Sequence, residues 1–269
     1  MNTTIFNHEF RTRLRSVFNW SLGIASIILI YSYFFSTFAD QAAVINEAMK
    51  NFPAALRAAF GMDRVDLSTV LGYFSFVFVF VQLCLAIQAS YYGFGLVSIE
   101  ESELTADFLL SKPVSRTQVM TSKLLAALTS LLITDLVMWA VSLAAVTLFR
   151  GEREYDFATL LLLLLSILVF QLFFLGVGLA VSLLVRRVRN VTPYALGLAF
   201  GMYVLNAFSG IFGDVKLELI TPFKHFDTTY IVTYAEYNLP LVLLSAAVIL
   251  VALAASYWLY IRRDIPSVS

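Results

Sequence analysis

Six uninterrupted apolar stretches dominate this sequence, and each is about as long as a helix that crosses a lipid bilayer. They cover residues 17–38, 70–97, 119–149, 158–185, 191–213 and 239–261. A hydrocarbon core of roughly 30 Å requires about 20 apolar residues of helix. Because lipid offers no hydrogen-bond partners, a spanning segment has to satisfy its backbone groups internally. The sequence therefore predicts an all-α integral membrane protein with six transmembrane helices in a single domain over residues 1–269.

An alternating run, YFSFVFVFVQ (73–82), is the feature that would suit a membrane β-barrel. Barrel strands are about ten residues long with one polar face, whereas this run stays apolar as far as residue 97. Composition supports helices in lipid, since 60% of the residues are hydrophobic and 13% are charged, against roughly half and a quarter in soluble proteins. The formal net charge is zero, so no charge excess points to nucleic acid as a partner.

The distribution of cations predicts the orientation. If both termini are cytoplasmic, eleven of the 18 lysines and arginines fall in cytoplasmic segments close to span ends, and seven fall in the outer loops. This bias follows the positive-inside rule. The first apolar stretch lacks a small-residue cleavage site, so we expect it to stay as a span. The sequence thus predicts a multi-pass protein of the cell membrane with cytoplasmic termini.

Three segments outside the spans have helical character. The N-terminal segment carries an apolar stripe that three arginines avoid, which favours an amphipathic interfacial helix; a plain basic flank of the first span is the alternative. Pro53 and Gly61 suit the two ends of a short helix in the first outer loop. Residues 214–238 either dip into the interface or cap the outer face. The N-terminal stripe is Phe6, Phe10, Leu14 and Phe18, and the arginines are Arg11, Arg13 and Arg15.

The loop between the second and third spans, SIEESELTADFLLSKPVSR (98–116), concentrates charge in an otherwise apolar chain. Its acids suit a helix N-terminus, and Pro113 ends that helix because it disfavours helical geometry in the preceding residue. The S-R-T-Q sequence at 115–118 has capping-box spacing and begins the next helix. We therefore expect a short amphipathic helix, with Leu104 and Phe108 one turn apart, that either docks another protein or lies on the membrane.

The stretch EESELTADFLLSKPVSRTQVMTSK resembles a segment of the permease subunits of type-2 ABC transporters. The basic N-terminal helix, the six spans, AALRAAFG in the first outer loop and TPFKHFD after the fifth span extend the resemblance. One departure is Leu104-Thr105, where members often have Gly-Thr. The resemblance implies a coupling helix at about 100–112 that binds a groove of a separate ATPase. The residues implied in this coupling are Glu100, Glu101, Glu103, Leu104, Asp107, Phe108, Leu109, Pro113 and Arg116.

The resemblance also implies partners. The complex would contain two ABC ATPase subunits and a second permease subunit, as a homodimer or heterodimer, in membrane lipid. The sequence has no G-x-x-x-x-G-K-[ST] phosphate loop, so we expect no enzymatic activity and no cofactor in this chain, with ATP and Mg²⁺ bound by the ATPase. One cysteine and two distant histidines predict no metal site. We therefore predict that this chain forms one half of the translocation path of an exporter whose substrate is a drug, a lipid or a peptide.

Two other classes of function stay open at this stage. A non-transporting scaffold or sensor subunit would use the same cytoplasmic helix to recruit a soluble partner. An ion-coupled carrier is less consistent with the sequence, because we find no internal three-span repeat and one intramembrane acid.

Polar and aromatic residues inside the spans are candidates for the translocation path. Asp135 lies near the middle of the third span, where an ionised acid costs about 2.5–3.5 kcal/mol. It either contacts substrate or a proton, or it is a hydrogen-bonded packing residue. The resemblance implies a path lined by the second and fifth spans, where the candidates are Phe78, Gln82, Gln88, Tyr203 and Asn206. Lipid contact and helix packing are the alternative roles for these residues.

Small residues at a four-residue spacing predict close helix packing. Gly197 and Gly201 form such a pair in the fifth span, and Gly178 with Ser182 forms one in the fourth. Small residues let two helix backbones approach in lipid. The Gly197 pair therefore suits either a homodimer contact or packing within the chain.

Overall fold

The computed structural model describes residues 2–41, 44, 47, 51–53, 57, 66–102, 114–185, 188–212 and 215–262. Within these ranges six helices are long and apolar enough to cross a membrane, and there are no strands. This result confirms the predicted all-α class and the number of spans. The six are α1 (Thr3–Tyr33) continued by α2 (Phe35–Asp40), α5 (Val70–Ser102), α7 (Arg116–Phe149), α8 (Phe157–Leu184), α9 (Val191–Phe212) and α13 (Leu239–Arg262).

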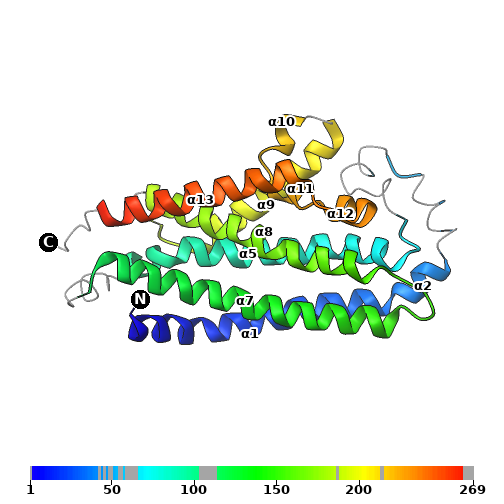
Figure 1. Cartoon of the computed structure of the whole chain (residues 1–269), viewed down its shortest axis with the longest axis horizontal. Helices are drawn as coiled ribbons and strands as arrows, with labels where there is room; N and C mark the ends of the chain where they lie inside the picture. Colours follow the sequence, from blue (N-terminus) through cyan, green and yellow to red (C-terminus); the bar gives the residue numbers. More distant parts are fainter. Residues whose placement is uncertain are drawn as a thin grey trace.

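The long helices form two groups that lie side by side (Figure 1). The first group is α1 and α7, which run in the same direction and pack along their length. At one end the Asn2 backbone N–H donates to Ser122 Oγ over 2.8 Å, and at the other the rings of Tyr33 and Phe149 lie 6.0 Å apart. In the second group α8 packs on α5 and α13, while α9 packs on α5. The start of α1 and the end of α13 lie at one end of the bundle, which we call the terminal end. α2 lies at the other end, which we call the opposite end.

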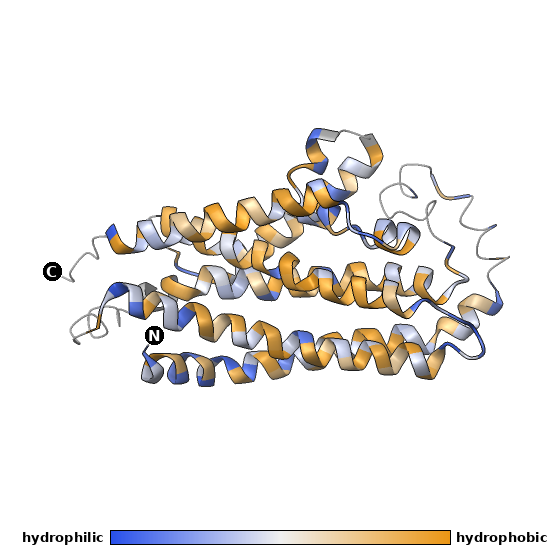
Figure 2. Ribbon diagram, in the orientation of Figure 1, coloured by the Kyte–Doolittle hydropathy of each residue, from blue (hydrophilic) through white to orange (hydrophobic). Residues whose placement is uncertain are grey.

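The hydropathy of the residues varies along the length of the bundle. Figure 2 shows hydrophobic residues along the middle of the long helices and hydrophilic residues near both ends and in the first turns of α1. With 34 residues, α7 is roughly 51 Å long, so it exceeds a hydrocarbon core of about 30 Å. The first turns of α7 therefore extend beyond the lipid at the terminal end if the middle of the helix is centred in the bilayer.

Two glycines bring α5 and α8 into backbone contact. A Cβ at Gly93 would overlap the carbonyl oxygen of Leu175, and a Cβ at Gly178 would lie 3.2 Å from the carbonyl oxygen of Ser90. Neither position leaves space for a larger side chain without separation of the helices. The second group is therefore organised around this crossing.

The boundary between the two groups is polar. Helix contacts are sparser here than within each group, and hydrogen bonds cross the boundary along most of its length. Because buried polar groups need partners, these bonds set the register of one group against the other. The pairs are Tyr73 OH to the Tyr31 carbonyl (2.9 Å), Tyr92 OH to Ser16 Oγ (3.2 Å), Gln88 Nε2 to Thr134 Oγ1 (2.9 Å) and Trp139 Nε1 to the Leu164 carbonyl (3.0 Å).

The segment after α9 enters the opposite end of the bundle. It forms α10 (Val215–Glu218), α11 (Pro222–His225) and α12 (Thr228–Tyr234). Phe223 and Phe226 are buried beside the ring of Phe170, and His225 Nδ1 lies 2.6 Å from Ser245 Oγ. Burial lowers the pKa of the His225 imidazole, against the effect of nearby backbone carbonyls. The sequence left this segment undecided, and the structure shows it as a packed cap on the helices.

The N-terminal segment is not a separate interfacial helix, which corrects the prediction. α1 continues unbroken from Thr3 into the first span, because no proline or glycine interrupts residues 3–22. Its start is capped by the Asn2 side chain, which accepts hydrogen bonds from two backbone N–H groups. Leu14 and Phe18 of the apolar stripe are 44% and 66% exposed. Leu14 and Phe18 therefore face outward, whereas Phe6 and Phe10 are partly buried. Among the charged residues, Glu9 and Arg13 pack inside the protein, while Arg11 and Arg15 are exposed.

The helix boundaries around the 98–116 loop are partly as predicted. Ser115 caps α7 and forms a capping box with Gln118, which confirms the predicted start of the long third helix. By contrast, α5 runs on to Ser102 instead of ending near residue 97, since no proline or glycine follows Gly95 in this part of the helix. The outer helix expected between Pro53 and Gly61 lies largely outside the described residues.

Candidate functional site

The loop between α5 and α7 is the first candidate site, and the structure describes its two ends. Glu100 and Glu101 belong to the last turn of α5, so they continue the second span and do not begin a new helix. Arg116 begins α7, and its guanidinium donates to the carbonyls of Tyr260 and Ile261 at the end of α13 (3.3 and 3.2 Å). The other predicted coupling residues, Glu103, Leu104, Asp107, Phe108, Leu109 and Pro113, lie outside the described residues.

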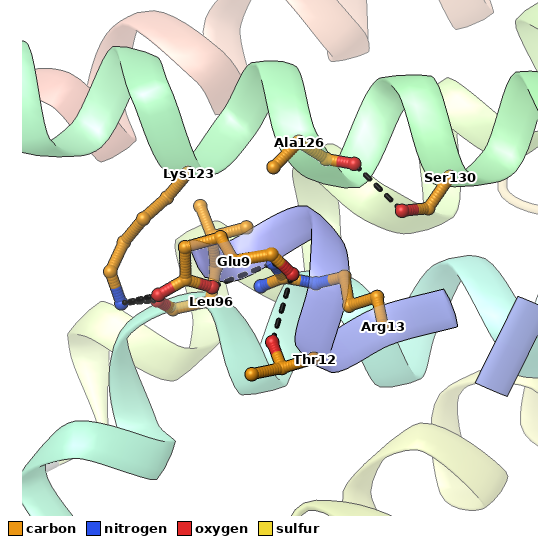
Figure 3. A network of polar contacts seen from close by, with 7 residues as sticks. All are labelled: Glu9, Thr12, Arg13, Leu96, Lys123, Ala126 and Ser130. Carbon is orange, nitrogen blue, oxygen red and sulfur yellow. Dashed lines mark hydrogen bonds and ion pairs between the residues drawn. The ribbon is translucent and has the colours of Figure 1, made fainter. Parts of the chain in front are cut away.

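A buried charged cluster joins three helices at the base of this loop (Figure 3). Lys123 of α7 donates to the carbonyl of Leu96 in α5 over 2.7 Å, and its ammonium lies 3.4 Å from a Glu9 carboxylate oxygen of α1. Glu9 also pairs with Arg13 one turn later, at 2.6 Å. The side chains of Lys123 and Glu9 are 3% and 14% exposed. We call these four residues the Lys123 cluster.

Burial makes the Lys123 cluster energetically important. Lysine is almost never fully buried unless it is paired, and a hydrogen bond to a charged group contributes about 1.5–3 kcal/mol. Two further contacts surround the cluster: Arg13 lies over the ring of Tyr92 at 6.0 Å, and the Asn2 N–H binds Ser122 Oγ. The terminal end of the bundle is therefore held by specific polar contacts as well as by apolar packing.

Sequence reasoning missed this cluster. Arg13 and Lys123 each had a local explanation as cations that flank a span, and Glu9 was not singled out. The available signal was the i, i+4 spacing of Glu9 and Arg13, which places an acid and a base on one face of a helix. The third partner is distant in the sequence, so spacing alone did not identify it.

Asp135 is buried between α7 and α8 and has an amide partner. With the Gln171 amide oriented so that its nitrogen faces the acid, Gln171 Nε2 lies 3.0 and 3.1 Å from the two carboxylate oxygens. Both residues are 1% exposed. This is the geometry of a hydrogen-bonded packing residue, the second of the two roles that the sequence left open. A role in transport stays a prediction.

The structure does not bring the other candidate path residues together. Phe78, Gln82 and Gln88 are buried inside the chain; Gln82 donates to the Phe226 carbonyl over 3.0 Å, and Gln88 binds Thr134 across the boundary between the groups. Tyr203 and Asn206 are partly exposed on α9. The candidates in α5 thus lie within the fold of one chain, whereas those in α9 lie beside an outward face.

The outward face of α9 carries Gly197 and Gly201 among exposed apolar side chains. Apart from the surrounding turns of α9 itself, no atom of the described residues lies within 4 Å of a Cβ built at Gly197 or Gly201. Packing within the described part of the chain therefore does not use this pair, and the close contacts are those of Gly93 and Gly178 instead. Exposed side chains that flank the two glycines are Leu196, Phe200, Val204 and Phe208.

The described residues contain no group of three or more His, Cys, Asp or Glu side chains placed to hold a metal ion. In a comparison with known families, residues 3–265 match the family described as ABC-2 family transporter protein. Searches of curated proteins and of solved structures gave no match. Because the family match covers nearly all of a chain with six membrane-length helices, this protein belongs to the ABC-2 family of transporter proteins.

Proposed function

We propose that this chain is the permease subunit of an ATP-driven exporter in the cell membrane, with both termini in the cytoplasm. It forms half of the translocation path and obtains energy from a separate ABC ATPase, present in two copies, that binds ATP and Mg²⁺. The observation that carries the proposal is family membership over residues 3–265 in a multi-pass helical chain. The absence of a phosphate loop from the sequence is consistent with a non-catalytic subunit.

In this proposal the loop between α5 and α7 binds the ATPase. The loop leaves the bundle at the terminal end, between two helices that extend beyond the length needed to cross lipid. Leu104 and Phe108 provide the apolar contact, and the acids at the end of α5 provide charge. ATP binding in the partner then displaces the loop, and the differential affinity of the two ATPase states for it supplies the energy.

The combined replacement Leu104→Glu and Phe108→Glu should remove ATPase binding. Two buried apolar contacts are worth about 3 kcal/mol or more together, so the affinity should fall about a hundredfold or more. The measurement is copurification, in detergent, with the ABC ATPase from the neighbouring reading frame. Phe52→Glu, an exposed phenylalanine at the opposite end, is the matched control and should retain the partner. Unchanged copurification by the double variant would contradict the docking role.

A second permease subunit, either another copy or a related chain, packs on the outward face of α9. The two glycines allow backbone approach there, and the flanking aromatic residues would be buried by it. Gly201→Cys in a Cys84→Ala background should form a disulfide-linked dimer in membranes. Val251→Cys, on the exposed face of α13, should not. The mass of the product distinguishes a homodimer from a heterodimer, and a monomer alone would contradict this contact.

A scaffold or sensor subunit would bind the same ATPase without moving a substrate. The discriminating assay is ATP hydrolysis by the reconstituted complex in the presence of amphipathic drugs, lipids or peptides. An exporter should show stimulation by at least one class, whereas a scaffold should show none.

A further inference from the structure

The Lys123 cluster lies at the point where the two helix groups meet below the loop. Leu96 is six residues before the end of α5, and Lys123 is seven residues after the start of α7. The Lys123–Leu96 hydrogen bond therefore joins the two helices that lead into and out of the loop, about two turns from each helix end. Glu9 and Arg13 add α1, so the cluster joins three of the helices that lie at the base of the loop.

This hydrogen bond crosses a boundary that is otherwise weakly packed. α1 and α7 pack on each other along their length, and α5 packs on α8 and α9, whereas α5 and α7 contact each other much less. Along that boundary the α5–α7 contacts include Gln88 with Thr134, about two turns further into the bundle. Nearer the loop, Lys123 attaches α5 to α7, and one turn away Tyr92 of α5 contacts α1 through Ser16 and Arg13.

We propose that Lys123 is a positioning residue for energy coupling, which with Glu9 makes both ends of the loop move as one body. The inference rests on the proposed function, because it assigns the loop to ATPase binding. A displacement of the loop then acts on α5 and on the α1/α7 pair together. Without the cluster, a displacement of the loop would move α5 relative to α7. The movement would then not be transmitted from one helix group to the other.

Charge and burial explain why a lysine suits this role. An ammonium offers several donors on a flexible stem, so Lys123 can satisfy a helix carbonyl and a carboxylate at once. Glu9 is held by Arg13 in the same helix, which orients its carboxylate toward Lys123. The pair is shielded from solvent, so counter-ions screen it little.

The test uses spin labels that report on the two groups separately. At the terminal end, His8→Cys on α1 pairs with Arg189→Cys; both positions are exposed, and Val188 and Val191 beside Arg189 pack on Phe94 of α5. At the opposite end, Leu148→Cys on α7 pairs with Leu239→Cys on α13, both exposed. Each pair is placed in a Cys84→Ala chain diluted with unlabelled chain, and distances are measured with and without the ATPase and a non-hydrolysable ATP analogue.

Lys123→Met should broaden the terminal-end distance distribution even without the ATPase, and it should abolish the nucleotide-dependent shift at the opposite end. Met has a similar length and leaves Glu9 paired with Arg13, so the variant should fold. Lys123→Arg should retain both wild-type behaviours. Glu9→Gln should have a smaller effect, because the Lys123–Leu96 bond remains, and Arg11→Gln, an exposed cation on α1, should have none.

The outcomes separate the inference from the proposed function. If Lys123→Met keeps a narrow terminal-end distribution and the wild-type shift at the opposite end, the positioning role is wrong while the exporter stands. If the wild-type chain fails to bind the ATPase, or shows no nucleotide-dependent shift at either pair, the proposed function fails and the coupling role fails with it. The terminal-end distribution of Lys123→Met without the ATPase then still shows whether the cluster joins α5 to the α1/α7 pair.

Discussion

Gly93→Leu is expected to abolish the folded state of the chain. Any Cβ at this position overlaps the Leu175 carbonyl oxygen, which is a rigid part of α8. To fit a leucine, α5 and α8 would have to separate along the crossing on which the second helix group is built. Overpacking of a well-packed interior costs about 1–3 kcal/mol and occasionally more, and here the clash is with backbone, which cannot move to another rotamer.

The measurement is thermal unfolding in detergent, with Gly93→Ala as a graded variant. Gly93→Ala should also lose stability, although the better helix propensity of alanine returns about 1 kcal/mol. Gly23→Ala in α1 is the matched control. Apart from the surrounding turns of α1 itself, no atom of the described residues lies within 4 Å of a Cβ there, so this variant should be neutral or stabilising. A Gly93→Leu protein as stable as wild type would show that α5 and α8 do not meet at this point.

Gln171→Leu is expected to destabilise the protein more than the double variant Asp135→Leu with Gln171→Leu. Removing the amide leaves a buried acid without the partner that the structure shows for it, at a cost of about 1–3 kcal/mol, and more if the acid is charged. Replacement of both partners by apolar groups of similar size removes the unsatisfied acid, so part of the loss should be recovered.

A thermodynamic cycle of the two single variants and the double variant measures this effect by chemical denaturation. Asp135→Asn, which keeps a hydrogen-bonding side chain, serves as the conservative comparison and should be nearly neutral. Additive losses in the double variant would mean that the two residues do not interact. If Asp135 is a packing residue, transport by Asp135→Asn and Asp135→Leu, normalised to folded protein, should be retained.

Local features of this fold could be predicted from the sequence. The capping box of Ser115 and Gln118 depends on four consecutive residues, and the structure contains it. The six spans follow from length and hydropathy alone. The outcome differed where a prediction depended on distant partners. The sequence predicts a separate interfacial helix at the N-terminus, but α1 is continuous with the first span, and its Glu9 pairs with Lys123 of α7.

The glycines also show that sequence spacing does not identify the helix that a residue packs against. Gly178 was matched with Ser182 by spacing, yet its close neighbour is the Ser90 carbonyl of α5. Gly93 has Ala89 four residues before it, but such pairs are common in membrane helices, and this one does not by itself indicate which helix lies opposite. Spacing identifies which residues share a helix face, but the identity of the opposing helix is a property of the whole fold. The Lys123 cluster is of this kind, since its members come from three helices.

The pairing of α1 with α7 has a consequence for how the chain is made. Glu9 and Arg13 are synthesised with the first span, but Lys123 is 114 positions after Glu9 in the chain. At about 5–20 residues per second, translation takes roughly 6–23 s to reach it. During that interval α1 is already in the membrane, and α5 is inserted, while the Lys123 partner of Glu9 has not been synthesised. Until α7 is made, Arg13 is the partner of Glu9 that the chain already contains, so the packing of α1 on α7 can form only after α5 has been synthesised.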